Sequence, residues 1–168
     1  MQKLSNDTDY VIQPKPGQTM NTISLGSDHA GYILKEKIKI FLENKCYKIN
    51  DFGCFSEEAS DYPDYCYPAA LSVATGESDF GIVFGGSGNG EAMVANKVRG
   101  VRCGVCWNIE SARLTKQHNN ANMIAIGARM VSESEALEMV HTWLNEKFEG
   151  GRHLNRLSKM EKRHEPIL

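Results

Sequence analysis

A glycine-rich loop is the first part of the sequence that could support chemistry. Residues 85–91 read Gly-Gly-Ser-Gly-Asn-Gly-Glu and connect an apolar segment, residues 80–85, to a segment with helical spacing. Such a loop directs several backbone N–H groups toward one point, and the following helix N-terminus adds partial positive charge. The sequence therefore predicts an anion site built from Gly86, Ser87, Gly88, Asn89 and Gly90.

Two familiar nucleotide-binding motifs fail at this loop. The dinucleotide motif G-x-G-x-x-G, counted from Gly86, requires glycine at the position of Glu91. The phosphate-loop motif G-x-x-x-x-G-K-[ST], counted from Gly85, has Glu91 in place of its lysine and Ala92 in place of its hydroxyl residue. Both departures put a negative charge where a polyphosphate would bind, so we expect no nucleotide here.

A carboxylate beside an anion site makes sense if the anion is transient. Glu91 would remove a proton from a carbon next to a carbonyl, and the loop N–H groups would stabilise the resulting enediolate. The alternative is that Glu91 only interacts favourably with the helix dipole, as acidic residues in first turns commonly do. The loop alone favours this second, structural role.

Other polar residues stand at or near the predicted ends of strands and helices. Asp28 and His29 follow the first predicted strand, and Arg129 lies just beyond the last. His118 and Asn119 end a predicted helix. All of these except Arg129 have a plain structural alternative, namely an N-cap aspartate, a loop histidine or a helix C-cap. Because ligand sites form outside the carboxyl ends of parallel strands, we expect these loops to converge.

The end of the chain is basic. Arg152, Arg156, Lys159 and Arg163 are spaced as one face of a helix. This face is either simply solvated or a phosphate clamp, because arginine forks bind phosphate oxygens bidentately. Nucleic-acid binding is poorly supported, since 19 Lys and Arg against 21 Asp and Glu give a net charge of −2. If this helix reached another subunit, the site would be shared in a dimer.

Histidine and cysteine patterns exclude other chemistry. The histidines show no H-x-x-x-H spacing, so we expect no metal. Cys103 and Cys106 lie in one predicted strand on opposite faces, which indicates packing. The odd number of cysteines in a chain of this size indicates free thiols, a reducing compartment and a cytoplasmic protein.

The remaining pattern alternates strands and helices. The 168 residues correspond to one domain, residues 22–164, preceded by a loose polar leader, residues 1–21. The predicted strands are 22–26, 47–51, 80–85, 102–106 and 123–127, and the predicted helices are 31–44, 65–75, 89–98, 109–118, 132–145 and 152–163. Ser132 and Glu135 form a capping box. This order predicts a three-layer α/β/α, Rossmann-like fold with a five-stranded parallel sheet. No apolar run approaches the ~20 residues that span a bilayer, so we expect no membrane association.

Taken together, the motifs resemble one family, the type B ribose-5-phosphate isomerases and their galactose-6-phosphate isomerase relatives. The resemblance covers residues 22 to about 160. The matching stretches are Gly26–Gly31, Asp51–Gly53, Asp61–Asp64, Gly85–Glu91, Ala95–Lys97, Ala112–Leu114, His118–Asn119, Ile126–Arg129 and Phe148–His153. Each stretch is weak alone, but their joint order is specific.

The resemblance implies an aldose–ketose isomerase that acts on a phosphorylated sugar without a metal or other cofactor. It implies a homodimer or a dimer of dimers whose active sites are shared between subunits. In many members a cysteine is the base, at a position where this sequence has Gly85 or Gly86. This chain instead resembles the subgroup with a glutamate later in the loop, here Glu91.

The resemblance also implies a role for each site residue. Glu91 would be the base that interconverts ribose 5-phosphate and ribulose 5-phosphate through a cis-enediolate, and His118, assisted by Asp28, would open the sugar ring. Asn119 would hold sugar hydroxyls, and Gly86 to Gly90 would cradle the enediolate. The phosphate would be bound by His29, Arg129, Arg152 and Arg156. The alternatives are another sugar phosphate, such as galactose 6-phosphate or a four-carbon sugar phosphate, or a non-catalytic sugar-phosphate-binding regulator.

Overall fold

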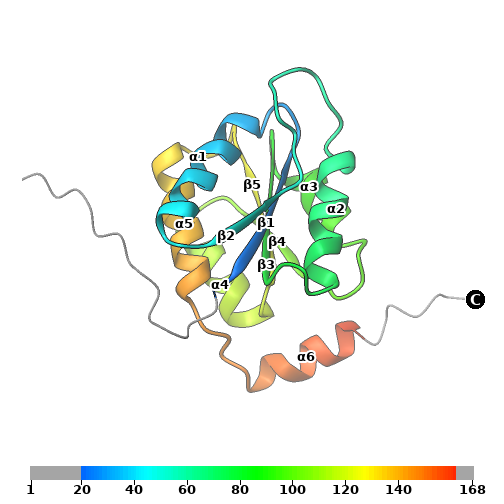
Figure 1. The fold of residues 1–168 in the computed structure, drawn as a ribbon. Helices are drawn as coiled ribbons and strands as arrows, with labels where there is room; N and C mark the ends of the chain where they lie inside the picture. The colour runs from blue at the N-terminus through cyan, green and yellow to red at the C-terminus, as the bar shows by residue number, and fades with distance from the viewer. Residues whose placement is uncertain (1–19, 162–168) are drawn as a thin grey trace, which may run out of the picture.

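A parallel sheet of five strands forms the centre of the molecule (Figure 1). The computed structural model describes residues 20–161, so Arg163 of the predicted basic face and most of the predicted leader lie outside the described residues. The strands are β1 (Thr22–Ser27), β2 (Lys48–Asp51), β3 (Phe80–Gly85), β4 (Cys103–Cys106) and β5 (Met123–Gly127). Their spatial order is β2-β1-β3-β5-β4, and every neighbouring pair is parallel. The predicted α/β class and five-stranded parallel sheet are confirmed.

Helices cover both faces of the sheet. They are α1 (Tyr32–Asn44), α2 (Pro63–Ala74), α3 (Asn89–Ala95), α4 (Ile109–Asn119), α5 (Glu133–Asn145) and α6 (Arg152–Glu161). One buried cluster joins α1, α4 and α5 to one face, and a second joins α2 and α3 to the other. Figure 1 shows α6 apart from both layers, at the bottom of the domain. Within residues 20–161 no helix is both long and apolar enough to span a bilayer.

The central strand β3 is apolar on both sides, as its sequence predicts. Ile82 and Phe84 pack into the cluster under α1 and α5, whereas Val83 packs into the cluster under α2 and α3. All three side chains are fully buried. This alternation follows from the two-residue period of a strand, and burial on both faces is typical of parallel sheets.

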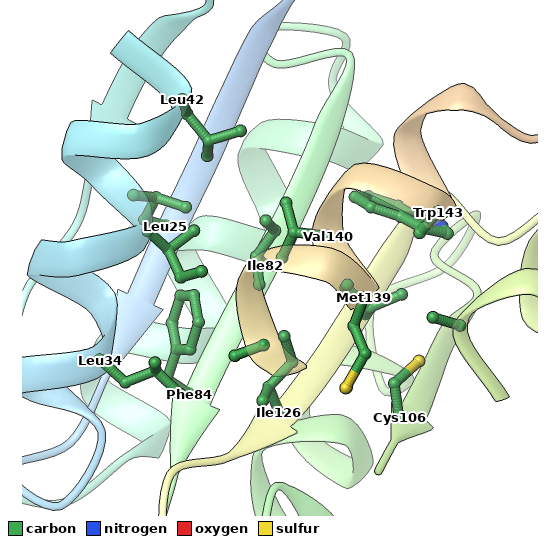
Figure 2. Packing of buried hydrophobic residues seen from close by; sticks show 14 of the residues in the cluster. Leu25, Leu34, Leu42, Ile82, Phe84, Cys106, Ile126, Met139, Val140 and Trp143 are labelled. Carbon is green, nitrogen blue, oxygen red and sulfur yellow. The ribbon is translucent and has the colours of Figure 1, made fainter. Parts of the chain in front are cut away.

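Large side chains hold α5 against the sheet (Figure 2). Trp143 is fully buried, and its ring meets that of Phe80 edge to face, with centroids 5.5 Å apart. Its indole N–H donates to the carbonyl of Ala121 at 3.3 Å, so its polar atom is satisfied. Burying a side chain of this kind stabilises the fold by about 1.5–3 kcal/mol.

Local signals predicted most element boundaries. The capping box of α5 is confirmed, because Ser132 Oγ accepts from the Glu135 N–H at 3.3 Å and Glu135 Oε2 accepts from the Ser132 N–H at 2.9 Å. Helix α3 is shorter than predicted. The Asn96 side chain bonds both backbone groups of Cys103 at 2.8 Å, which fixes the residue after the helix to β4.

The cysteines behave as packing residues. Cys103 belongs to the cluster under α2 and α3, and Cys106 belongs to the cluster under α1 and α5, so the prediction of opposite faces is confirmed. Burial raises the pKa of the Cys106 thiol to about 12 and raises that of Cys66 further. These thiols therefore stay protonated and are poor nucleophiles.

The strand order creates a switch point. From β1 the chain moves outward to β2, then returns across β1 to β3 on its other side. The loops that follow β1 and β3 consequently leave the same edge of the sheet side by side, which is where α/β proteins bind ligands.

Candidate active site

Glu91 lies at the end of β3, folded back over the last residue of that strand. It occupies the first turn of α3, and only 3% of its surface is exposed. A Cβ added to Gly85 would overlap the Glu91 carboxyl group and would lie 3.0 Å from its Cγ. Glycine at position 85 therefore leaves the space that the carboxylate occupies.

The loop between Gly85 and Glu91 is tied to the neighbouring strand β5. The N–H of Arg129 donates to the carbonyl of Gly86 at 3.1 Å, and the N–H of Ala128 donates to the carbonyl of Gly85 at 2.8 Å. Gly88 has φ +82°, a left-handed conformation that disfavours other residues. These contacts tie the start of the loop to the residues that follow β5.

Burial decides the acidity of Glu91. Desolvation raises the pKa of its carboxyl group, the nearby charge of Asp28 adds to the increase, and the N–H groups of Glu91 and Gly88 oppose it. The net direction is upward. Asp28 is itself buried, and its Oδ1 accepts from the Gly31 N–H at 3.0 Å. Gly31, not Asp28, is the N-cap of α1, so the alternative of a capping aspartate is wrong.

A cleft of about 540 Å³ opens above Glu91. The predicted site residues that line it are Asp28, His29, Gly86, Ser87, Gly90, Glu91 and Arg129. Tyr62 also lines it, and sequence reasoning gave this residue no role. The Tyr62 ring lies against Gly90, where an added Cβ would come within 2.7 Å of its Cζ. The only trace of this contact in the sequence is the glycine at position 90, which leaves room for the ring.

The loop between β2 and α2 orients His29. The backbone N–H of His29 donates to Ser60 Oγ at 3.1 Å. The ring Nδ1 lies 3.2 Å from both the backbone nitrogen and the carbonyl oxygen of Ser60. With Nδ1 engaged in this way, Nε2 is the ring atom left for a ligand.

A buried ion pair supports the loop after β1 from below. Lys35 is fully buried, and its Nζ contacts Asp51 at 2.7 and 2.8 Å. Asp51 Oδ1 also accepts from the Gly53 N–H at 3.0 Å, and the Gly53 carbonyl accepts from the Ser27 N–H at 2.6 Å. This chain of contacts fixes Ser27, the residue directly before Asp28.

The other predicted site residues lie at the opposite end of the strands from the cleft. Helix α4 starts after the carboxyl end of β4 and has 11 residues, so it runs about 16 Å back along the sheet. His118 and Asn119 are its last residues, and Arg152 and Arg156 lie on α6. Figure 1 shows α6 at the end of the domain opposite the loop of residues 52–62. One chain alone does not bring His118 to Glu91.

His118 lies in a small polar cluster of its own. Its ring stacks on that of His153, with centroids 4.4 Å apart and an interplanar angle of 7°. Glu149 Oε2 lies 3.8 Å from His118 Nε2 and 3.7 Å from His153 Nε2. His118 is far in sequence from Glu149 and His153, so histidine spacing gave no sign that the three residues meet.

The same cluster is a weak candidate for a metal. One ligand atom from each of His118, Glu149 and His153 lies within 4.8 Å of the others. However, two parallel rings cannot direct both nitrogen lone pairs at one ion, and Arg152 Nε, a cation, lies 3.4 Å from His153 Nε2. The donor geometry and the local charge therefore both oppose a resident cation.

Comparison with known proteins extends over nearly the whole described domain. Residues 23–160 match a family model described as Ribose/Galactose Isomerase. The chain is 46% identical over 123 residues to "Ribose-5-phosphate isomerase B" of Mycolicibacterium paratuberculosis, an alignment that covers 73% of this chain and 77% of that protein. It is 43% identical over 138 residues to the Escherichia coli protein of the same name, covering 82% and 93%.

Solved structures agree with the sequence comparison. A ribose-5-phosphate isomerase B of Clostridium thermocellum matches with a TM-score of 0.83 and 45% identity, over 84% of this chain and 95% of that one. A ribose-5-phosphate isomerase B of Mycoplasma genitalium, solved with bound ribulose-5-phosphate, matches with a TM-score of 0.82 and 36% identity, over 86% and 97%.

Proposed function

Because the chain belongs to the ribose/galactose isomerase family and is an isomerase, we propose that it interconverts ribose 5-phosphate and ribulose 5-phosphate, with Glu91 as the base. The observation that carries this proposal is the position of Glu91, buried at the base of a cleft between loop N–H groups and Asp28. The ribulose-5-phosphate bound to the Mycoplasma genitalium relative supports the choice of substrate.

The reaction moves a carbonyl group from C1 to C2. The Glu91 carboxylate takes the proton from C2, which leaves a cis-enediolate, and the same carboxyl group returns a proton to C1. The hydroxyl proton of O2 passes to O1, so no atom is gained or lost. Base catalysis of this kind contributes about 10²–10⁴-fold, and hydrogen bonds from the glycine loop to the enediolate supply a further part of the rate enhancement.

The environment of Glu91 suits a base that must also give its proton back. Its raised pKa makes the carboxylate a stronger base than an exposed glutamate, which favours removal of the proton from C2, and the strongly basic enediolate then takes the proton back. Because the side chain is buried, water has little access to the carboxylate itself.

The complete site requires a second copy of the chain. Four of the predicted site residues lie near the amino-terminal ends of the strands, namely His118, Asn119, Arg152 and Arg156. We propose that they enter the cleft of a partner subunit in a two-fold dimer. Exposed apolar side chains beside the cleft and on its neighbouring elements support this arrangement. They include Met93, Trp107 and Met130, each at least 60% exposed.

Each residue then has a specific task. The partner's His118 transfers the proton that opens the furanose ring, and the partner's Asn119 holds sugar hydroxyls. The phosphate is bound by His29 and Arg129 of one subunit and by the partner's Arg152 and Arg156. Arginine forks match phosphate oxygens, so binding energy is gained away from the reacting carbons and orients them.

A proton NMR time course in D₂O tests the substrate assignment. The purified protein, without added metal, should convert ribose 5-phosphate into ribulose 5-phosphate that carries deuterium at C1. If it neither converts nor exchanges this substrate, the assignment fails. A panel containing galactose 6-phosphate and four-carbon sugar phosphates would then separate another isomerase from a regulator that only binds.

A further inference from the structure

His118 is held by residues that the mechanism above does not use. One third of its side chain is exposed, and it ends helix α4. A histidine at such a position would normally sample several orientations. Here one face of its ring is covered by the parallel ring of His153, and its Nε2 lies 3.8 Å from Glu149 Oε2, within ion-pair distance.

The chain between α5 and α6 is built to bring these two residues to α4. The Glu149 N–H donates to the carbonyl of Gln117, the residue before His118, at 3.0 Å. Gly150 and Gly151 follow with φ +68° and +54°, conformations that favour glycine and reverse the chain. After this turn His153 lies in the first turn of α6, with its Nε2 3.7 Å from the same carboxylate oxygen.

His153 is suited to stacking rather than to proton transfer. Only 5% of its side chain is exposed, and burial, together with the positive charges of His118, Arg152 and Arg156, lowers its pKa. The lowered pKa disfavours a positive charge on the ring that stacks on His118, although the Glu149 carboxylate opposes this effect. A second charged ring 4.4 Å away would instead repel the imidazolium of His118.

We propose that Glu149 and His153 are positioning residues for His118: the Glu149 carboxylate fixes the direction of Nε2, and the His153 ring fixes the plane. This proposal rests on the proposed function, in which His118 opens the sugar ring. Their loss should impair ring opening and leave proton transfer at Glu91 intact. Misplacement of a catalytic group by about 1 Å can cost about 100-fold in rate.

The test separates the two steps by choice of substrate. Ribose 5-phosphate is a closed ring and needs His118. Ribulose 5-phosphate has its O5 phosphorylated and is open, so deuterium uptake at its C1 in D₂O needs only enediolate formation. Glu149→Gln and His153→Ala should lower turnover of ribose 5-phosphate about 10- to 100-fold while C1 exchange stays within about twofold of wild type. Glu138→Gln and His141→Ala, at exposed positions of α5, are the matched controls.

A second readout does not depend on activity. The ring resonances of His118, followed by heteronuclear NMR of histidine-labelled protein, should shift in both variants and not in the controls. Unchanged His118 resonances would overturn the proposal even if the wild type showed no isomerase activity. Equal losses of turnover and C1 exchange, or unchanged turnover in both variants, would also overturn it.

Discussion

The carboxylate of Glu91 occupies the space that a side chain on Gly85 would fill. A Cβ at position 85 would overlap the carboxyl group, with the Cγ of Glu91 at 3.0 Å. Position 85 is also one of the two positions where the resemblance places the cysteine base of other family members. The finding therefore supports the proposal that a glutamate six residues later in the chain acts at the same point in space.

This relationship predicts the behaviour of a double variant. Gly85→Cys alone should be nearly inactive, because its side chain displaces Glu91. Gly85→Cys combined with Glu91→Ala should recover at least about tenfold over Glu91→Ala alone, since the thiol then occupies the vacated space. Turnover of ribose 5-phosphate is the measurement, and alkylation of the new thiol should abolish the recovered activity. A double variant no better than Glu91→Ala would show that the two positions are not equivalent.

The pH dependence of activity should reflect the raised pKa of Glu91. The base must be ionised, so kcat should fall as the pH is lowered through a midpoint above 4.5, the ordinary value for glutamate. The measurement is a pH–rate profile for ribose 5-phosphate. An acid midpoint at or below 4.5 would contradict the effect of burial.

The same pKa shift predicts a stability effect with a definite sign. A folded-state pKa above the unfolded value contributes stability that is complete below the unfolded pKa and is lost as pH rises through the folded pKa. Glu91→Gln removes this loss, so its Tm should exceed that of wild type at neutral pH, and the difference should shrink toward pH 4. Glu57→Gln, at an exposed loop position, is the control. An equal Tm difference at both pH values would exclude titration of Glu91 as the cause.

A shared site predicts complementation between inactive variants. Glu91 and His118 lie at opposite ends of the strands of one subunit, and each proposed site combines Glu91 of one subunit with His118 of the other. A dimer of one Glu91→Gln subunit and one His118→Ala subunit therefore contains one intact site and one site that carries both changes. After the subunits are mixed one to one and allowed to exchange, about a quarter of wild-type activity should return. No recovery, with exchange verified by mass spectrometry, would place the whole site within one chain.

The two arginines of α6 should act on binding. Arg152→Ala and Arg156→Ala should each raise KM about 10- to 100-fold with a smaller change in kcat, because a charge-assisted hydrogen bond to phosphate contributes about 1.5–3 kcal/mol. Arg99→Ala, at an exposed position outside the proposed site, is the control. An unchanged KM in both variants would leave this face merely solvated.

Local patterns were enough to predict much of the fold. Two features depend only on residues close together in sequence: the continuous apolar run of β3 and the capping box of Ser132 and Glu135. Both can therefore be predicted from the sequence alone. The end of α3 was predicted too late because it depends on the Asn96 side chain reaching the backbone of Cys103, a contact that helical periodicity does not reveal.

Only part of the candidate site could be predicted, because some of its contacts join parts of the chain that are distant in sequence. The glycine loop indicated an anion site beside Glu91, but the burial that raises its pKa depends on the neighbouring strands. The contact of His118 with His153 has no signature in residue spacing, because a separate turn brings them together. Nor does sequence show that Glu91 and His118 lie at opposite ends of the strands.

The rate of Glu91→Gln tests the central claim most directly, because this change keeps the shape of the side chain and removes only its basicity. With ribose 5-phosphate in D₂O, the variant should fold normally, bind substrate, and lose both conversion and deuterium uptake at C1 by about 10²–10⁴-fold. Conversion and exchange at the wild-type rate would contradict the account, since another group would then be moving the proton.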